Sequence, residues 1–237
     1  MTKRMIAAQL SLGALLLVLV ALMESYTDWD MAAQRLWFDS ATHEWMVSNA
    51  LHARLTWFFY DGPKILLVAL GIACIAGVLG GARWNLPPEC RRGCRLLLLS
   101  LSLVPMLLGG AKQFTNVYCP RQIEAFGGEY VHQGVLECRN PANEGRSPGR
   151  CFPAGHASGG FALMMLFFCF RSRRARWAGL GVGLAAGWCM GFYQMLRGQH
   201  FLSHTLFTMI GAWMIILLVT WALRSFSLNR FKYKYLS

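Results

Sequence analysis

Charged side chains are scarce in this sequence. Asp, Glu, Lys and Arg together make up 14% of its 237 residues, whereas a soluble domain carries about a quarter. Acidic residues are the rarest, with 11 Asp and Glu against 23 Lys and Arg, while hydrophobic residues reach 55%. Internal repeats and low-complexity linkers are also missing. These features argue against a soluble protein and predict a single membrane domain covering residues 1–237.

Long apolar runs predict membrane-spanning helices. A span needs about 20 mostly apolar residues, and its backbone groups must bond within the segment because lipid offers no partners. The first run is not followed by a small-x-small cleavage site, so it is predicted to be a retained anchor rather than a signal peptide. We therefore expect an all-α, polytopic protein with six transmembrane helices. The predicted spans are residues 6–23, 63–81, 96–110, 157–170, 177–196 and 205–223.

The basic residues orient these spans. If the N-terminus is inside, the inner segments hold fourteen basic residues and one acid, Glu89, while the outer segments hold nine basic and ten acidic residues. The positive-inside rule then predicts a bacterial inner-membrane protein with both termini in the cytoplasm. The net charge of +12 is thereby explained by topology, so we expect lipid partners and no nucleic acid. The inner basic residues are Lys3, Arg4, Arg83, Arg91, Arg92, Arg95, Arg171, Arg173, Arg174, Arg176, Arg224, Arg230, Lys232 and Lys234.

Two outer segments are too long to be simple turns. Residues 24–62 carry aromatic residues among acids and histidines, which favours a helix lying in the membrane interface after the first span. Residues 111–155 are rich in Gly, Pro, Asn and charge, and a loop of this length is typically functional. We expect it to be ordered because it contains cysteines.

Three cysteines fall in the predicted outer segments, where disulfides persist. They are Cys119, Cys138 and Cys151. Because three is an odd number, at most one bridge forms within the chain. We expect this bridge to join Cys138 to Cys151.

Three clusters of polar residues stand at predicted helix ends on the outer face. Lys112 follows the third span, Pro153-Ala154-Gly155-His156 opens the fourth, and residues 197–204 join the fifth to the sixth. Basic side chains, imidazoles and a glycine at a helix N-terminus are the components of a phosphate site. Histidine attacks phosphorus or protonates a leaving group near neutral pH. The chain lacks the carboxylate pair of a glycosidase and the Gly-rich nucleotide loop of a kinase.

The order and spacing of these residues resemble the type 2 phosphatidic acid phosphatase superfamily. Its motifs are Lys-x6-Arg-Pro, Pro-Ser-Gly-His and Ser-Arg-x5-His-x3-Asp. The resemblance implies that Lys112 clamps phosphate, that His156 is the general acid, and that His200 is the nucleophile that becomes phosphorylated. It also implies that the Gly155 amide faces the phosphate. No metal and no other cofactor is implied.

The first and third motifs diverge from the family pattern. Arg121 lies just beyond the proline of the first motif and is a candidate phosphate ligand. If residues 194–204 are helical, Arg197 lies one turn from the missing arginine and replaces it. His204 likewise follows His200 by one turn and can fix its tautomer, so it joins the candidate catalytic residues. Ala154 is predicted to line the substrate site without the serine hydroxyl. The departures are Cys119 for Arg, Ala154 for Ser, Gln194 for Arg and His204 for Asp.

The leading hypothesis is a membrane phosphatase that hydrolyses a lipid phosphate monoester or diphosphate at the outer face through a phosphohistidine. A lipid phosphotransferase of the same family is one alternative. Another is a non-catalytic scaffold with a degenerate site. A third is a zinc site made by His200 and His204 with His156 nearby.

Overall fold

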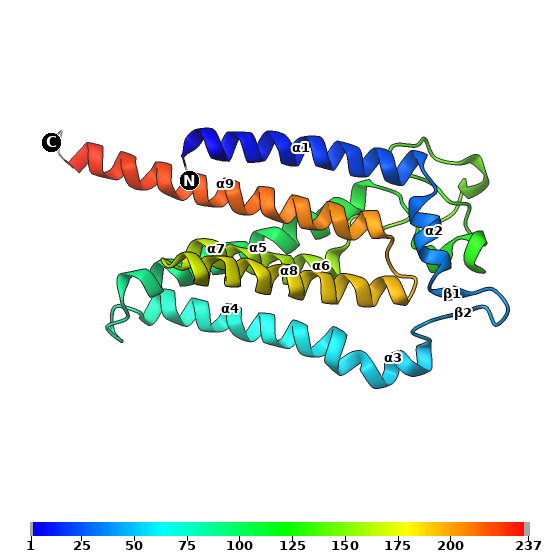
Figure 1. The fold of residues 1–237 in the computed structure, drawn as a ribbon, viewed down its shortest axis with the longest axis horizontal. Helices are drawn as coiled ribbons and strands as arrows, with labels where there is room; N and C mark the ends of the chain where they lie inside the picture. The colour runs from blue at the N-terminus through cyan, green and yellow to red at the C-terminus, as the bar shows by residue number, and fades with distance from the viewer. Residues whose placement is uncertain (1, 235–237) are drawn as a thin grey trace.

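The computed structural model describes residues 2–234, with side chains up to Leu223. It is a bundle of helices that run roughly along one axis (Figure 1). The long elements are α1 (Lys3–Tyr26), α4 (Gly62–Gly80), α5 (Pro88–Ala111), α8 (Arg173–Leu196) and α9 (Leu202–Lys234). Between α5 and α8 lie α6 (Gly155–Ala162), a 3-10 turn (Leu163–Met165) and α7 (Leu166–Cys169), which follow one another directly.

Four helical stretches of the described chain are long and apolar enough to cross a membrane. They correspond to the first, second, third and sixth predicted spans. The α6–α7 stretch, Gly155–Cys169, is apolar but shorter. Helix α8 has full length, but it begins with three arginines and contains five glycines, which lower its hydropathy. The structure therefore supports a polytopic membrane protein with four membrane-capable helices. The four span-capable stretches are Lys3–Tyr26, Asn49–Gly80, Pro88–Phe114 and Leu202–Leu223.

Glycines allow α6 and α8 to pack backbone against backbone. A Cβ on Gly187 of α8 would lie 2.1 Å from Cδ1 of Phe161, and a Cβ on Gly160 of α6 would lie 2.6 Å from the Gly187 nitrogen. Small residues permit this close approach between membrane helices. Helix α6, which begins at the second sequence motif, is consequently held against α8 with little freedom to shift.

The segment after α1 differs from the predicted interfacial helix. It contains two short helices, α2 (Trp29–Arg35) and α3 (Asn49–Thr56), separated by a hairpin of β1 (Phe38–Asp39) and β2 (Glu44–Trp45). Asp39 produces the turn, because its carboxylate accepts hydrogen bonds from the Ala41 amide at 2.9 Å and the Thr42 hydroxyl at 2.9 Å. Local side-chain bonding of this kind competes with helix formation. The protein is therefore mostly helical, and this short hairpin replaces part of the predicted interfacial helix.

The long loop between α5 and α6 is built from short turns. Its 3-10 turns are Lys112–Phe114, Pro120–Gln122, Glu124–Phe126 and Pro141–Asn143. The buried side chain of Asn143 holds two segments of the loop together. It accepts a hydrogen bond from the Val131 amide at 3.0 Å and donates one to the Val131 carbonyl at 2.9 Å. The loop packs over the end of the bundle that carries α2 and the hairpin (Figure 1).

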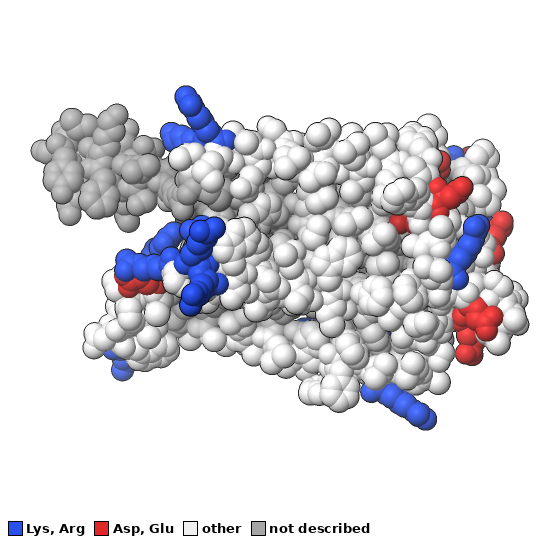
Figure 2. All heavy atoms as spheres, viewed as in Figure 1, with Lys and Arg blue, Asp and Glu red and all other residues white. Residues whose placement is uncertain are grey.

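Charge divides between the two ends of the bundle. Basic side chains gather at the end where α4 meets α5, and most visible acidic ones lie at the opposite end (Figure 2). At the basic end Glu89 is paired with Arg171 at 2.9 Å. This distribution follows the predicted inner and outer segments. Four of the predicted inner cations, Arg224, Arg230, Lys232 and Lys234, lie outside the residues whose side chains are described.

Candidate active site

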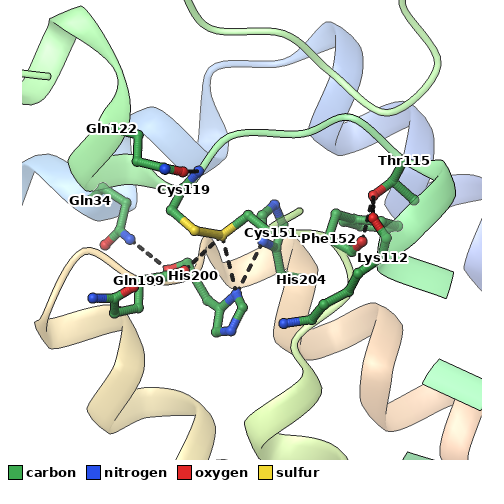
Figure 3. The surroundings of a disulfide bond; sticks show 10 residues. All are labelled: Gln34, Lys112, Thr115, Cys119, Gln122, Cys151, Phe152, Gln199, His200 and His204. Carbon is green, nitrogen blue, oxygen red and sulfur yellow. Dashed lines mark hydrogen bonds between the residues drawn. A yellow bond between two sulfur atoms is a disulfide. The ribbon is translucent and has the colours of Figure 1, made fainter. Parts of the chain in front are cut away.

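The three sequence clusters meet at one end of the bundle. Lys112 follows α5 directly, His156 is the second residue of α6, and His200 lies between α8 and α9. The ring centroids of His156 and His200 are 6.2 Å apart. A Cβ on Gly155 would lie 3.0 Å from Cε of Lys112 and 3.1 Å from its Nζ. The ammonium group thus lies against the N-terminus of α6, and its chain extends toward the His200 ring (Figure 3).

His200 is buried, with 3% of its surface exposed. Its Nδ1 lies 3.5 Å from Sγ of Cys151 and 3.5 Å from Nδ1 of His204 (Figure 3). Because Nδ1 is occupied, Nε2 is the ring nitrogen left for a substrate. Burial lowers the pKa of His200 well below its ordinary value, and the nearby His204, Lys112 and His156 lower it further. The imidazole is consequently neutral near pH 7 and keeps the lone pair that a nucleophile needs.

Residues 194–204 do not form one continuous helix, so the condition on which the positions of Arg197 and His204 were inferred is not met. Helix α8 ends at Leu196, Gly198 adopts a left-handed φ of 65°, and α9 begins at Leu202. A Cβ on Gly198 would lie 2.3 Å from the indole of Trp45, so the chain turns where the hairpin packs on it. His204 nevertheless reaches the His200 ring. Arg197 also remains beside Gln194, whose Oε1 accepts a hydrogen bond from its Nη1 at 3.3 Å.

Several predicted site residues, catalytic His156 among them, divide between two cavities. Lys112, Gly155 and His156 line a largely apolar cavity of about 620 Å³ between α4 and α5. Arg121 and Arg197 line a polar cavity of about 340 Å³ beside the hairpin. Ala154 is fully buried behind the site, where its carbonyl accepts a hydrogen bond from the Thr208 hydroxyl at 3.3 Å. Burial lowers the pKa of His156 to about 4, and the charges of Lys112, Lys64 and Arg197 contribute to this shift.

Tyr60, which was not predicted from the sequence, contacts His156. Its hydroxyl lies 2.9 Å from Nε2 of His156, and the two ring centroids are 4.8 Å apart. Nζ of Lys64 lies 4.3 Å from the centroid of the Tyr60 ring. Tyr60 belongs to a π-helical turn, Trp57–Asp61, that joins α3 to α4. Such turns are frequent at functional sites because they redirect a side chain within a helix. No sequence spacing relates residue 60 to residue 156.

Two buried polar residues of α2 were also missed. The Asp30 carboxylate accepts hydrogen bonds from the amide of Ser203, at 2.9 Å, and from its hydroxyl. Nε2 of Gln34 donates to the carbonyl of His200 at 2.7 Å. Asp30 is 2% exposed and Gln34 is fully buried. Together they tie His200 and the first turn of α9 to α2. Their only signal in the sequence is polarity within an aromatic segment.

The predicted Cys138–Cys151 bridge is wrong, although the chain does contain one disulfide. It joins Cys119 to Cys151, and Cys138 is free and exposed. The Cys151 amide donates to the Val117 carbonyl at 2.9 Å, which aligns the segments that carry the two bonded cysteines. The cystine therefore replaces the arginine of the first motif and abuts His200 (Figure 3).

We expect this disulfide to contribute strongly to stability. It closes a loop with a sequence separation of 32, and loop-closure entropy predicts a contribution of about 3–4 kcal/mol. The double substitution Cys119→Ser/Cys151→Ser should lower the free energy of unfolding by this amount in denaturant titrations of the detergent-solubilised protein. Cys138→Ser is the matched control and should leave unfolding unchanged. Equal unfolding midpoints for the double variant and wild type would contradict the prediction.

The proposed zinc grouping differs from the arrangement found. Within the described residues, the ligand atoms of Cys151, His200 and His204 lie within 4.8 Å of one another, and His156 is not in that group. Sγ of Cys151 is already bonded in the disulfide.

Comparison with known proteins supports the family resemblance. Residues 94–227 match the PAP2 superfamily. Neither a curated protein nor a solved structure matches the chain significantly. The family match covers more than half of the chain and includes Lys112, His156 and His200. The protein therefore belongs to the PAP2 superfamily.

Proposed function

We propose that the protein is a lipid-phosphate phosphatase that works through a phosphohistidine on His200. Membership of the PAP2 superfamily indicates phosphatase-type activity. The observation that carries the proposal is the buried His200, whose Nδ1 is occupied while Lys112 and His156 lie around its ring. In this proposal the chain crosses a bacterial inner membrane six times. Both termini are cytoplasmic, and the site faces the periplasm.

The reaction has two steps. Nε2 of His200 attacks the phosphorus, and the bond to the leaving oxygen breaks. His156 binds a proton as the phosphate anion enters, because the anion offsets the burial and the neighbouring cations that lower its pKa to about 4, and it then donates this proton to the leaving oxygen. Water then attacks the phosphohistidine, releases inorganic phosphate and restores His200. Lys112 and the Gly155 amide at the α6 N-terminus stabilise the phosphoryl oxygens.

The altered motif positions keep part of the usual chemistry. His204 stands where the family has Asp, and its Nδ1 can accept from Nδ1–H of His200, which leaves the Nε2 lone pair free. Arg197 replaces the third-motif arginine from a position one turn away. Arg121 adds positive charge close to Arg197, because its backbone amide donates a hydrogen bond to the Gly198 carbonyl at 2.9 Å.

The apolar cavity supports a lipid substrate. Its polar end carries Lys112 and His156, and its wall continues through Ile72, Ile75 and Leu98 of α4 and α5. Its volume is in the range of small-molecule sites, about 300–1,000 Å³. A phosphate monoester or diphosphate with a hydrocarbon chain matches this combination of charge and apolar surface.

A panel of lipid phosphates tests the proposal. Wild type, His156→Ala and His200→Ala are assayed for phosphate release in detergent, with and without a chelator. We expect release by wild type in both conditions and its loss in the variants. Transfer of phosphate to a second lipid would instead identify a phosphotransferase, and equal rates for wild type and variants would favour a scaffold.

Removing the Tyr60 hydroxyl should slow the reaction. It orients the His156 ring, and a neutral hydrogen bond of this kind contributes about 1 kcal/mol. Tyr60→Phe should therefore reduce kcat about fivefold, with KM little changed, because 1.4 kcal/mol corresponds to about tenfold in rate. The measurement is steady-state hydrolysis of the best panel substrate. Tyr26→Phe, at an exposed position, is the control. An unchanged kcat would show that Tyr60 does not act through His156.

A further inference from the structure

One of the two disulfide sulfur atoms, Sγ of Cys151, belongs to a compact group of three atoms that could bind a metal ion. Sγ of Cys151 and Nδ1 of His204 each lie 3.5 Å from Nδ1 of His200. The three ligand atoms lie within 4.8 Å of one another, and all three residues are buried. Zinc–sulfur and zinc–nitrogen bonds of about 2.3 and 2.0–2.1 Å at tetrahedral angles place ligand atoms roughly 3.3–3.7 Å apart. Two of the three separations therefore already match a tetrahedral zinc site, and the third, between Cys151 and His204, is at most 4.8 Å.

While the disulfide is intact, Cys151 cannot bind a metal ion as a thiolate. A thiolate is the form of cysteine that binds metal, and Sγ of Cys151 is instead bonded to Sγ of Cys119. The disulfide thus keeps a soft, charged ligand away from the metal and leaves two imidazoles.

We propose that reduction of the Cys119–Cys151 disulfide creates a Cys-His-His site that binds a thiophilic divalent cation such as zinc. The bound cation prevents His200 from acting as a nucleophile. A dithiol supplies two electrons and two protons, so that it becomes a cyclic disulfide while both cysteines become thiols. The Cys151 thiol then loses its proton to solvent as the metal binds. Cys151, His200 and His204 supply three ligands, and water takes the fourth position.

Metal capture silences the nucleophile through its tautomer. A neutral imidazole that binds a cation through Nδ1 carries its proton on Nε2. The lone pair required for attack on phosphorus is then absent. His204 can also no longer accept a hydrogen bond from His200, because its Nδ1 binds the metal. The silencing rests on the proposed function, whereas metal binding itself does not.

Two single variants separate this site from the other cysteines. Cys119→Ser leaves the Cys151 thiol beside His200, and Cys151→Ser leaves the Cys119 thiol instead. Both contain the same number of thiols and lack the disulfide. The probe is Co²⁺, because a tetrahedral thiolate site gives a sulfur-to-cobalt charge-transfer band and visible d–d bands. We expect Cys119→Ser to bind one more Co²⁺ than Cys151→Ser, with a charge-transfer band that the additional substitution His204→Gln weakens.

Wild type provides the second arm and does not depend on the folding of a variant. A water-soluble phosphine reduces the disulfide by taking an oxygen atom from water and leaving two thiols. It contains no thiol of its own, and it is removed before cobalt is added. Reduced wild type should gain the same cobalt spectrum, and reoxidation should remove it. Absence of an additional cobalt site in both reduced wild type and Cys119→Ser would overturn the proposal.

Activity measurements separate metal binding from inhibition of the enzyme. Zinc should reduce phosphate release by Cys119→Ser at least tenfold, and a chelator should reverse this effect, while Cys151→Ser should be much less sensitive. Metal binding without inhibition would overturn the silencing. If oxidised wild type releases no phosphate from any panel lipid, the proposed function fails, and the cobalt spectra still decide whether the site exists.

Discussion

Replacing His200 with alanine should reduce lipid-phosphate hydrolysis on the order of 10⁴-fold or more. The substitution removes the atom that forms the bond to phosphorus in the proposed reaction. Lys112 and the α6 N-terminus would still bind the phosphoryl group, so KM should change much less than kcat. Steady-state kinetics on the best panel substrate measure both constants.

The intermediate gives an independent readout of the same prediction. A substrate labelled in its phosphate should leave label on wild-type protein after an alkaline quench, which preserves phosphohistidine, and none on His200→Ala. Gln199→Ala is a suitable control because residue 199 lies in the same loop. Its backbone amide donates to the backbone carbonyl of Gln194 at 2.9 Å, and the substitution keeps this bond. Near-normal turnover in this control would show that the loop tolerates a neighbouring change. Label on His200→Ala would place the nucleophile elsewhere.

The second large effect is expected at Asp30. Asp30→Ala leaves the buried amide and hydroxyl of Ser203 without their acceptor, and each unsatisfied buried group costs about 1–3 kcal/mol. We expect a loss of roughly 2–4 kcal/mol in the free energy of unfolding. Because Ser203 is at the start of α9, the His200 loop should loosen as well, and kcat should fall at temperatures where the protein stays folded. Denaturant titration and steady-state kinetics measure the two effects.

Two further variants show whether the effect of Asp30→Ala comes from the lost hydrogen bonds to Ser203. Asp28→Ala is the matched control, because Asp28 is exposed and its side chain does not cap α2. Asp30→Asn retains an oxygen that can accept from the Ser203 amide, so its effect should be intermediate. If Asp30→Ala unfolds at the same denaturant concentration as wild type, the contact between α2 and α9 does not stabilise the fold.

Local sequence patterns determined the helices and the outline of the site. Runs of apolar residues identified α1, α4, α5 and α9, because helix formation in an apolar medium depends on properties that neighbouring residues share. The order of the motifs identified Lys112, His156 and His200, and the structure brings them together. The odd number of outer cysteines correctly limited the chain to one internal bridge.

The tertiary structure decided the partners of these residues. Asp30 meets Ser203, Tyr60 meets His156, and Cys119 rather than Cys138 meets Cys151. Each pair joins distant parts of the chain, so no periodicity or spacing relates the two residues. The break at Gly198 has the same origin, because Trp45 of the hairpin occupies the space that a side chain there would need. Apolar patterning acts through nearest neighbours and is readable from sequence, whereas these contacts depend on how the packed helices place distant segments side by side.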